Sequence, residues 1–593
     1  MKRNIFKAFP AFAMMLLLAS CSDFFDQESD HVIYADKGHL GNATDTIYSV
    51  MGILNKMQVI SDRTILLGEV RGDLMDINDY TPADLRDVAR FDIGDDNIYN
   101  SPRDYYAIIN NCNYFIAHAD TALKNNRNEY IFKREYAAVK AFRAWTYLQL
   151  VLNYGQVPFV TDPILSSADA NKDYPMKGIQ EVCDYFISDI QPYATIETPR
   201  YGTIRSNDSR LFYFPIYILL GDLNLWAGHY EEAALNYYRY LATRNGTNSA
   251  YPTSTLSISW SATDSHWRNT SDSWSTNSFS NERYNDNSEL ITMIPGDSIP
   301  SEGNYSELRN IFNGLNNEDH AMLKPSQFMF DLSAAQQYCY LTSANDVVYA
   351  PQGLDDFQSG DLRLSSIYNK WKTSTSGNTI IISRRSNEDN YYISKYATRN
   401  VHIYRRTMVY LRLAEALNRA GYPRFAFEIL KNGVNNRQIE NEVIPYYTAD
   451  SVKLRQFDFP NNYYVLRSRS NQTSENTMGI HAHGCGWSSL DDNYVLPDDT
   501  LITDSLMRRD YQIEKVEDLI MEEEALEFAF EGYRFYDLMR VAMRRNDPSY
   551  LANRIYMRRG ADKVDEVKAF IGRDLNDTRN WYLNWNDQIG LGY

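Results

Sequence analysis

The feature that most constrains the fold is a long stretch that ends abruptly, residues 129–160, EYIFKREYAAVKAFRAWTYLQLVLNYGQVPFV. Small and apolar residues recur in it at spacings of three and four, which predicts one broad helix face: Ala137, Ala138, Ala141, Ala144, Trp145, Leu148 and Leu152. The polar residues expected on the hydrated side are Lys133, Arg134, Lys140 and Arg143. Gly155 ends the helix and Pro158 prevents it from restarting. A face of small residues needs helical neighbours, so the stretch predicts a helix-on-helix scaffold.

The N-terminus has the pattern of an exported, lipid-anchored chain. Three basic residues precede an apolar run at 11–19, which is too short to span a membrane and indicates a secretory signal. The run ends Leu18-Ala19-Ser20-Cys21, which resembles the bacterial lipoprotein box. We therefore expect residues 1–20 to be a signal peptide and Cys21 to be lipidated. The acidic residues that follow suit a solvated tether over 21–41 and are also similar to the surface-export signal of Bacteroidetes lipoproteins.

Charge and cysteine content narrow the class of partner. The net charge of −18, with no compensating basic run, argues against nucleic acid and anionic lipid surfaces as partners. The four cysteines after Cys21 are scattered, so they predict neither a disulfide framework nor a paired-cysteine metal site. Tyrosine is abundant, with 46 residues, and we assign most of these rings to helix interfaces and a minority to binding.

Helical periodicity recurs along the chain, and two segments repeat one pattern. Helix pairs are expected near 104–153, 211–243, 405–437 and 516–545, a further helix at 44–56, and a loop-rich segment at 61–102. In 211–241 and 404–434, small residues and a turn glycine keep the same offsets, around Gly228 and Gly421. This resembles the tetratricopeptide pattern of two antiparallel helices joined by a tight turn. A Ser-, Thr- and Asn-rich insertion, residues 245–404, separates the copies.

Several blocks, in family order, resemble the SusD/RagB family of outer-membrane nutrient-binding lipoproteins of Bacteroidetes. They are NNCN at 110–113, the helix ending in GQVP at 155–158, NSELI at 287–291, DLR at 361–363, RRTMVYLRLAEALNRAG at 405–421 and EEALEFAFEGYRFYDLMR at 523–540. The last block is the most specific. It departs from the family pattern at Glu524, where the family commonly has Arg. We expect its remaining charged residues to tie the last helices to the body.

The resemblance implies a mainly α-helical fold, with tetratricopeptide-like helix pairs and a large irregular portion, over a single domain at 42–593. It also implies a lipid-anchored protein that faces the cell exterior. Such a protein captures an oligosaccharide, or in some members a peptide, and hands it to a SusC-like TonB-dependent transporter in the outer membrane. The resemblance does not identify the glycan, and a structural calcium ion stays open.

Catalytic and metal motifs are scarce. The metalloprotease, nucleophile-elbow, phosphate-loop and dinucleotide motifs do not occur in the sequence, so we expect no enzyme activity and no catalytic residues. A surface glycoside hydrolase is the less favoured alternative, because its two carboxylates need no fixed spacing in sequence. The one metal-like cluster is His481, His483 and Cys485, but its glycines and the lack of a second ligand group favour a loop without metal.

Sugar capture needs rings that stack on pyranose faces and polar groups that bond hydroxyls. The insertion supplies both, and the candidate ligand contacts there are Trp260, Trp267, Trp274 and Tyr284, near Arg268 and Asn277. The alternative for each ring is to fix the loop to the body. A second candidate group is Arg71, Asp73 and Tyr80, near Glu69 and Asp76, for which the alternative is a charged turn. Trp487 is a third, weaker candidate.

Overall fold

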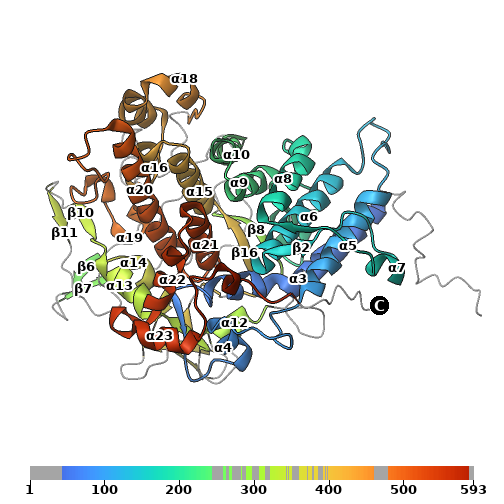
Figure 1. Cartoon of the computed structure of the whole chain (residues 1–593), viewed down its shortest axis with the longest axis horizontal. Coiled ribbons are helices and arrows are strands. Elements are labelled where there is room, and N and C mark those ends of the chain that lie inside the picture. The colour runs from blue at the N-terminus through green and yellow to red at the C-terminus, as the bar shows by residue number, and fades with distance from the viewer. Residues whose placement is uncertain are drawn as a thin grey trace, which may run out of the picture.

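The computed structural model describes most of the chain after the expected tether. The described residues are 43–243, 258–261, 266–269, 282, 289–296, 306–313, 321–341, 344, 346–349, 360–369, 371–376, 379–384, 392–393, 395–396, 398–459 and 479–585. Figure 1 shows two groups of long helices side by side, one from the N-terminal half and one from the C-terminal half, with short strands beside the second group. The predicted fold class, mainly α-helical with a large irregular portion, is confirmed.

The N-terminal group packs as successive antiparallel helices. It consists of α3 (Ala43–Glu69), α5 (Pro102–His118), α6 (Lys133–Tyr154), α8 (Ile179–Ile190), α9 (Ile216–Ala227) and α10 (Tyr230–Thr243). Helix α5 packs on α6, α6 on α8, α8 on α9 and α9 on α10. The expected pairs near 104–153 and 211–243 correspond to α5–α6 and α9–α10.

The C-terminal group begins where the insertion returns to the body. Its long helices are α15 (Arg406–Arg419), α16 (Pro423–Lys431), α20 (Ser505–Phe528), α21 (Arg534–Arg545), α22 (Pro548–Tyr556) and α23 (Val564–Ile571). Helix α15 packs on α10 from the first group as well as on α16 and α20. This contact joins the two repeat-like pairs, although the insertion separates them in sequence (Figure 1).

The strands of the described segments form only two-stranded antiparallel sheets. Strand β8 (Leu290–Ile294) pairs with β16 (Val401–Arg405), and β1 (Met75–Ile77) pairs with β9 (Leu323–Pro325). Two hairpins lie wholly inside the insertion, β6 (Ile258–Ser261) with β7 (His266–Asn269), and β13 (Trp371–Ser376) with β14 (Thr379–Arg384). Strand β8 lies inside the insertion and β16 lies at its end, so their pairing brings the end of the insertion back to an earlier part of it.

Helix α6 ends at Tyr154 and Gly155 has a φ of 76°, as predicted for a glycine that ends a helix. The expected hydrated side is wrong for two residues, because Lys140 and Arg143 are buried. Both pair with Asp189 of α8, at 2.5 and 2.9 Å. Helix α6 therefore lies inside the protein, and its cations are neutralised by a neighbouring helix rather than by water.

Helix α3 is longer than the sequence pattern predicts. The helix was expected over 44–56 with loops from residue 61, but it continues to Glu69. The extra turns bury Ile60, Ile65 and Leu66. This extension places residues 69–76 at the end of a buried helix rather than in a surface loop.

A first prediction concerns the close crossing of α9 and α10. A Cβ atom at Gly221 would lie 2.4 Å from the ring of Tyr237, whose hydroxyl donates to Asp222 at 2.6 Å. Gly221→Ala should displace this ring and destabilise the protein by about 1–3 kcal/mol, less the small gain in helix propensity. Urea unfolding measures the difference.

The matched control is Gly52→Ala in α3, because nothing lies within 4 Å of a Cβ added there. This variant should be stabilised by about 0.5–1 kcal/mol. Equal effects of the two substitutions would show that the crossing is not tight.

Candidate functional site

Described residues bound an open cavity of about 680 Å³. Four elements form its wall: the first half of α3, the β4–β5 hairpin (Thr203–Ile204 and Asn207–Asp208), the end of β8 and the start of α12 (Leu308–Asn313). Residues 398–400, just before β16, complete it. The cavity therefore lies where the N-terminal helices meet the middle and the end of the insertion.

Most of the described lining residues are polar and carry amide, hydroxyl or guanidinium groups. The polar residues that line the cavity are Asn55, Gln58, Arg205, Ser206, Asn207, Arg309, Thr398, Arg399 and Asn400. No described lining residue is acidic. Phe212 is the single aromatic ring among the described lining residues, and it is buried.

The β4–β5 turn presents two residues in a strained conformation. Arg205 and Ser206 have φ values of 47° and 70°, in the left-handed region that two-residue hairpins of type I′ require. Asn and Gly usually occupy such positions, so Arg and Ser here cost free energy. Strain of this kind is concentrated at functional sites, and the turn lies on the rim of the cavity.

The opposite wall is held by a buried carboxylate. Glu282 accepts hydrogen bonds from Thr398 at 2.5 Å and Asn400 at 2.6 Å, and lies 3.1 Å from His402. Burial opposes ionisation of this group, but the bond and charge of His402 and the bonds from Thr398 and Asn400 hold its pKa below the ordinary value. An ionised Glu282 thus fixes the 398–400 segment from behind.

Backbone contacts join the two walls. The Gln58 side chain donates to the Pro295 carbonyl at 2.6 Å, and the Gly296 amide donates to Asn400 Oδ1 at 3.0 Å. A Cβ atom at Gly296 would lie 2.1 Å from the Arg399 carbonyl oxygen, so only glycine fits. Arg399 itself donates to the Ser306 carbonyl at 2.9 Å.

The structure corrects two expected ligand contacts, Arg71 and Asp73, which are buried. The Arg71 guanidinium donates to the Leu67 and Trp581 carbonyls and to Asn153 Oδ1. Both Asp73 carboxylate oxygens accept from Arg534, at 2.6 and 2.8 Å. Their polar atoms bond protein groups, so we no longer propose them as ligand contacts.

The expected aromatic contacts have different outcomes. Tyr80 is 53% exposed but does not line the cavity. The β6–β7 hairpin pairs Trp260 with Trp267 in its register, while Trp274 and Tyr284 lie outside the described residues. The half-buried Trp487 packs against the hydrophobic core. Tyr80 and Trp487 are therefore not part of the described cavity wall.

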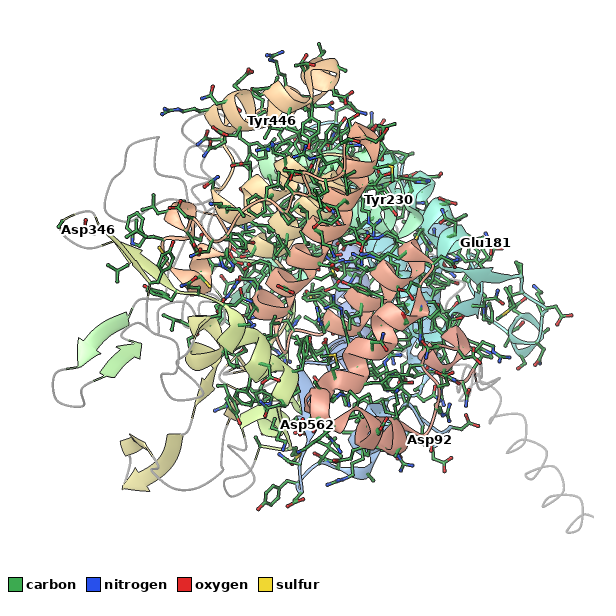
Figure 2. The ribbon with its side chains drawn as sticks, turned by 60° about the vertical axis from the view of Figure 1, so that its left-hand side comes forward. Asp92, Glu181, Tyr230, Asp346, Tyr446 and Asp562 are labelled. Carbon is green, nitrogen blue, oxygen red and sulfur yellow. The ribbon has the colours of Figure 1, made fainter. Side chains whose placement is uncertain are left out.

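Other exposed rings do not form a platform. Tyr130 lies under the Lys124 ammonium group at 4.5 Å, and Tyr446 lies under the Arg424 guanidinium at 3.6 Å. Figure 2 shows Tyr446 at the opposite end of the molecule from Asp562. The described exposed rings are therefore dispersed over the surface.

The metal-like cluster belongs to the interior. His481 lies 2.7 Å from Glu523, His483 lies 3.0 Å from Glu527, and the Cys485 thiol lies 3.4 Å from Asp361. Each side chain thus contacts a different carboxylate. Within the described part of the chain, no three His, Cys, Asp or Glu side chains are placed to hold a metal ion.

These carboxylates belong to a buried ionic network centred on two arginines. Arg363 pairs with Asp361, Glu523 and Glu527 at 2.6–2.8 Å. Arg405 pairs with Glu289, Glu527 and Glu531 at 2.7–2.9 Å, and Lys395 pairs with Glu531 at 2.5 Å. The network confirms that the charged residues of the last block tie α20 to the body.

The departure at Glu524 leaves an isolated acid. Its side chain is buried, and neither carboxyl oxygen has a hydrogen-bond partner. Burial, followed by the charges of Asp537 and Glu415, raises its pKa well above the ordinary value. The neighbouring pairs of Arg540 with Glu415 and Asp537 form without it.

Comparisons with known proteins agree with this fold. Residues 494–583 match the SusD family. A SusD-like protein from Bacteroides fragilis NCTC 9343 is 18% identical, with 86% of this chain and 88% of that chain covered and a TM-score of 0.52. A SusD superfamily protein from Bacteroides vulgatus ATCC 8482 is 13% identical, with 92% of this chain and 95% of that chain covered and a TM-score of 0.56. A SusD homolog from Bacteroides thetaiotaomicron VPI-5482 is 15% identical, with 94% of this chain and 93% of that chain covered and a TM-score of 0.53. No curated protein sequence matches the chain.

These matches define a SusD-like helical protein. They agree with the resemblance found in the sequence: the C-terminal segment, 494–583, matches the SusD family, and the fold of the chain is similar to that of SusD-like structures. Among the described helices, none combines the length and apolar character needed to span a membrane.

The cavity residues were missed by sequence reasoning, which looked for aromatic rings. They come from five separate segments, and no segment contains more than five of them. The one local signal was the hairpin at 203–208, where an arginine and a serine occupy a tight turn.

A second prediction follows from the buried acid. Because the pKa of Glu524 is raised in the folded state, its contribution to the free energy of unfolding is fully present below the unfolded-state pKa. This contribution is lost as the pH rises, because ionisation is disfavoured in the folded protein. Glu524→Gln should therefore be more stable than the parent at pH 8 by at least about 1 kcal/mol, with the difference shrinking toward pH 4.5. Urea unfolding at both pH values measures this.

Glu514→Gln, an exposed position on the same helix, is the control and should change stability by less than about 0.5 kcal/mol. A Glu524→Gln variant that is less stable at pH 8 would show that the carboxylate is ionised and partnered.

Proposed function

We propose that this chain is a cell-surface binding protein that captures an oligosaccharide and passes it to a SusC-like TonB-dependent transporter. The observation that carries the proposal is the open cavity of about 680 Å³ with its polar wall. Cavities of roughly 300–1,000 Å³ hold small ligands in known proteins. The SusD-like fold and the family match over 494–583 support the same class of function.

The wall chemistry suits hydroxyl-rich ligands. The side-chain amides of Asn55, Gln58, Asn207 and Asn400 line the cavity, and each amide can both donate and accept. A sugar hydroxyl also does both, so amide groups can satisfy it from either side. We retain Trp260, Trp267, Trp274 and Tyr284 as proposed stacking rings in the neighbouring insertion.

The same wall favours binding without turnover. Hydrolysis of a glycosidic bond requires two carboxyl groups about 5–10 Å apart around the bond. The described lining contains neither Asp nor Glu, and the nearby Glu282 is held by Thr398, Asn400 and His402. We therefore expect bound glycans to be recovered intact.

Peptide capture is the second candidate function, and one observation favours it. The described lining offers many amides but only one ring, the buried Phe212. Amides bond peptide backbone groups as well as hydroxyls, whereas stacking rings are the usual partner of pyranose faces. A ligand screen must therefore include both classes.

A third prediction tests the site. The soluble chain that starts at residue 22 should bind at least one oligosaccharide on a glycan array and leave it uncleaved. Calorimetry should show that Asn400→Ala and Asn207→Ala each weaken that ligand about tenfold, the loss of one hydrogen-bonding group. Asn128→Gly, in an exposed turn outside the cavity, is the control.

Trp267→Ala and Trp274→Ala test the insertion in the same assay. A ligand that is weakened by neither tryptophan variant removes these rings from the site. If no glycan and no peptide of a library bound above background, this result would contradict the proposed function as a whole.

A fourth prediction tests the proposed anchor. Cys21→Ser should abolish labelling of the chain by radioactive palmitate and shift it from the outer-membrane fraction to the soluble fraction. Cys112→Ala, which changes a buried thiol of the folded body, should keep both. Palmitate labelling that survives Cys21→Ser would place the lipid elsewhere.

A further inference from the structure

Three of the polar residues on the cavity wall are arginines. Arg205 comes from the β4–β5 turn, Arg309 from α12 and Arg399 from the segment before β16. They belong to three elements that are far apart in sequence, so the fold itself gathers them. This positive charge is notable in a chain of net charge −18.

Arg309 carries an unused donor. Its Nε atom is buried and has no hydrogen-bond partner. A buried donor without a partner is costly, and native structures rarely retain one without a reason. The same guanidinium group lines the cavity, so its other nitrogen atoms are placed to donate to a ligand oxygen there.

The described lining of the cavity contains these three arginines and no Asp or Glu side chain. Glu282, behind the wall, accepts from Thr398 and Asn400 and contacts His402. Asp62, which accepts from the Glu307 amide, has its pKa raised to about 6 by burial. Guanidinium groups bind carboxylate and sulfate oxygens more strongly than neutral hydroxyls, so this lining suits an anionic group.

We propose that the cavity selects acidic oligosaccharides, with a carboxylate or sulfate group held by Arg309 and Arg205 and the hydroxyls held by the amides. This inference rests on the proposed function and names its ligand class. The arginines fix the charged unit of the glycan, while the amides on α3 and residue 400 accept neighbouring sugar units.

Calorimetry on the chain from residue 22 tests the proposal with two matched probe pairs. Tetragalacturonate is compared with its carboxyl-reduced form, and a chondroitin sulfate tetrasaccharide with its desulfated form. At least one acidic probe should bind at least tenfold more tightly than its neutral or desulfated partner. The preferred pair tells whether carboxylate or sulfate is the recognised group, and raising sodium chloride from 50 to 500 mM should weaken the acidic probe.

The variants locate the charge. Arg309→Gln and Arg205→Gln should each reduce the preference for the acidic probe at least fivefold. Arg205 is exposed on a turn, so its variant stays informative if Arg309→Gln misfolds. Arg127→Gln, an exposed arginine outside the cavity, is the control and should leave the preference unchanged.

Each other result overturns a defined claim. Equal affinity for both members of each pair, with Asn400→Ala still weakening them, overturns the acidic preference and leaves the proposed glycan function standing. Binding of acidic peptides but of no glycan overturns both and favours the peptide alternative. Binding of no probe and no glycan on the array overturns the proposed function itself.

Discussion

The contact on which the rest of the structure depends is the buried salt bridge of Arg405 with Glu527 of α20 and with Glu531, which follows that helix. Arg405 ends β16 and pairs with Glu527 and Glu531, while Glu527 also accepts from Arg363 of the insertion. The Glu527 carboxylate therefore holds two segments that are far apart in sequence, one around Arg363 and one at the end of β16. Removal of one member of such a buried pair typically costs about 3–5 kcal/mol, because its partner is left as an uncompensated charge.

This salt bridge also fixes the site, which it does not touch. Because Arg405 anchors β16, the three residues before that strand are held at a set distance from α20, and they form one wall of the cavity. The other wall belongs to α3, which is tied to the body just beyond its end by Arg71 and by Asp73, the partner of Arg534 in α21. The charged residues of the family-like blocks are thus internal supports, and the cavity is lined by residues outside those blocks.

How much of this the sequence could predict depended on the range of each signal. The end of α6 and the pairing of α9 with α10 follow from local glycine chemistry and periodicity, so both were predictable. Arg143 was not, because the Asp189 that buries it comes from another helix. The prediction of Arg71 and Asp73 as ligand contacts was wrong for the same reason. The sequence does not tell whether a charged residue in a turn is exposed or buried until its partners are known. The cavity is a property of five segments together, and no local pattern carries it.

The distribution of charge explains why an acidic protein can hold a cationic cavity. Many of its carboxylates lie in the interior beside arginines, as Glu415 does with Arg540 and Asp73 with Arg534. Their fields are neutralised within a few ångströms, so they do not reach the wall formed by Arg205 and Arg309. At physiological salt, charges on the far surface are screened beyond about 8 Å. An anionic sugar that reaches the cavity therefore meets guanidinium groups, while the nearby Glu282 is engaged by Thr398 and Asn400. Local geometry, and not net charge, sets which ligands this protein can accept.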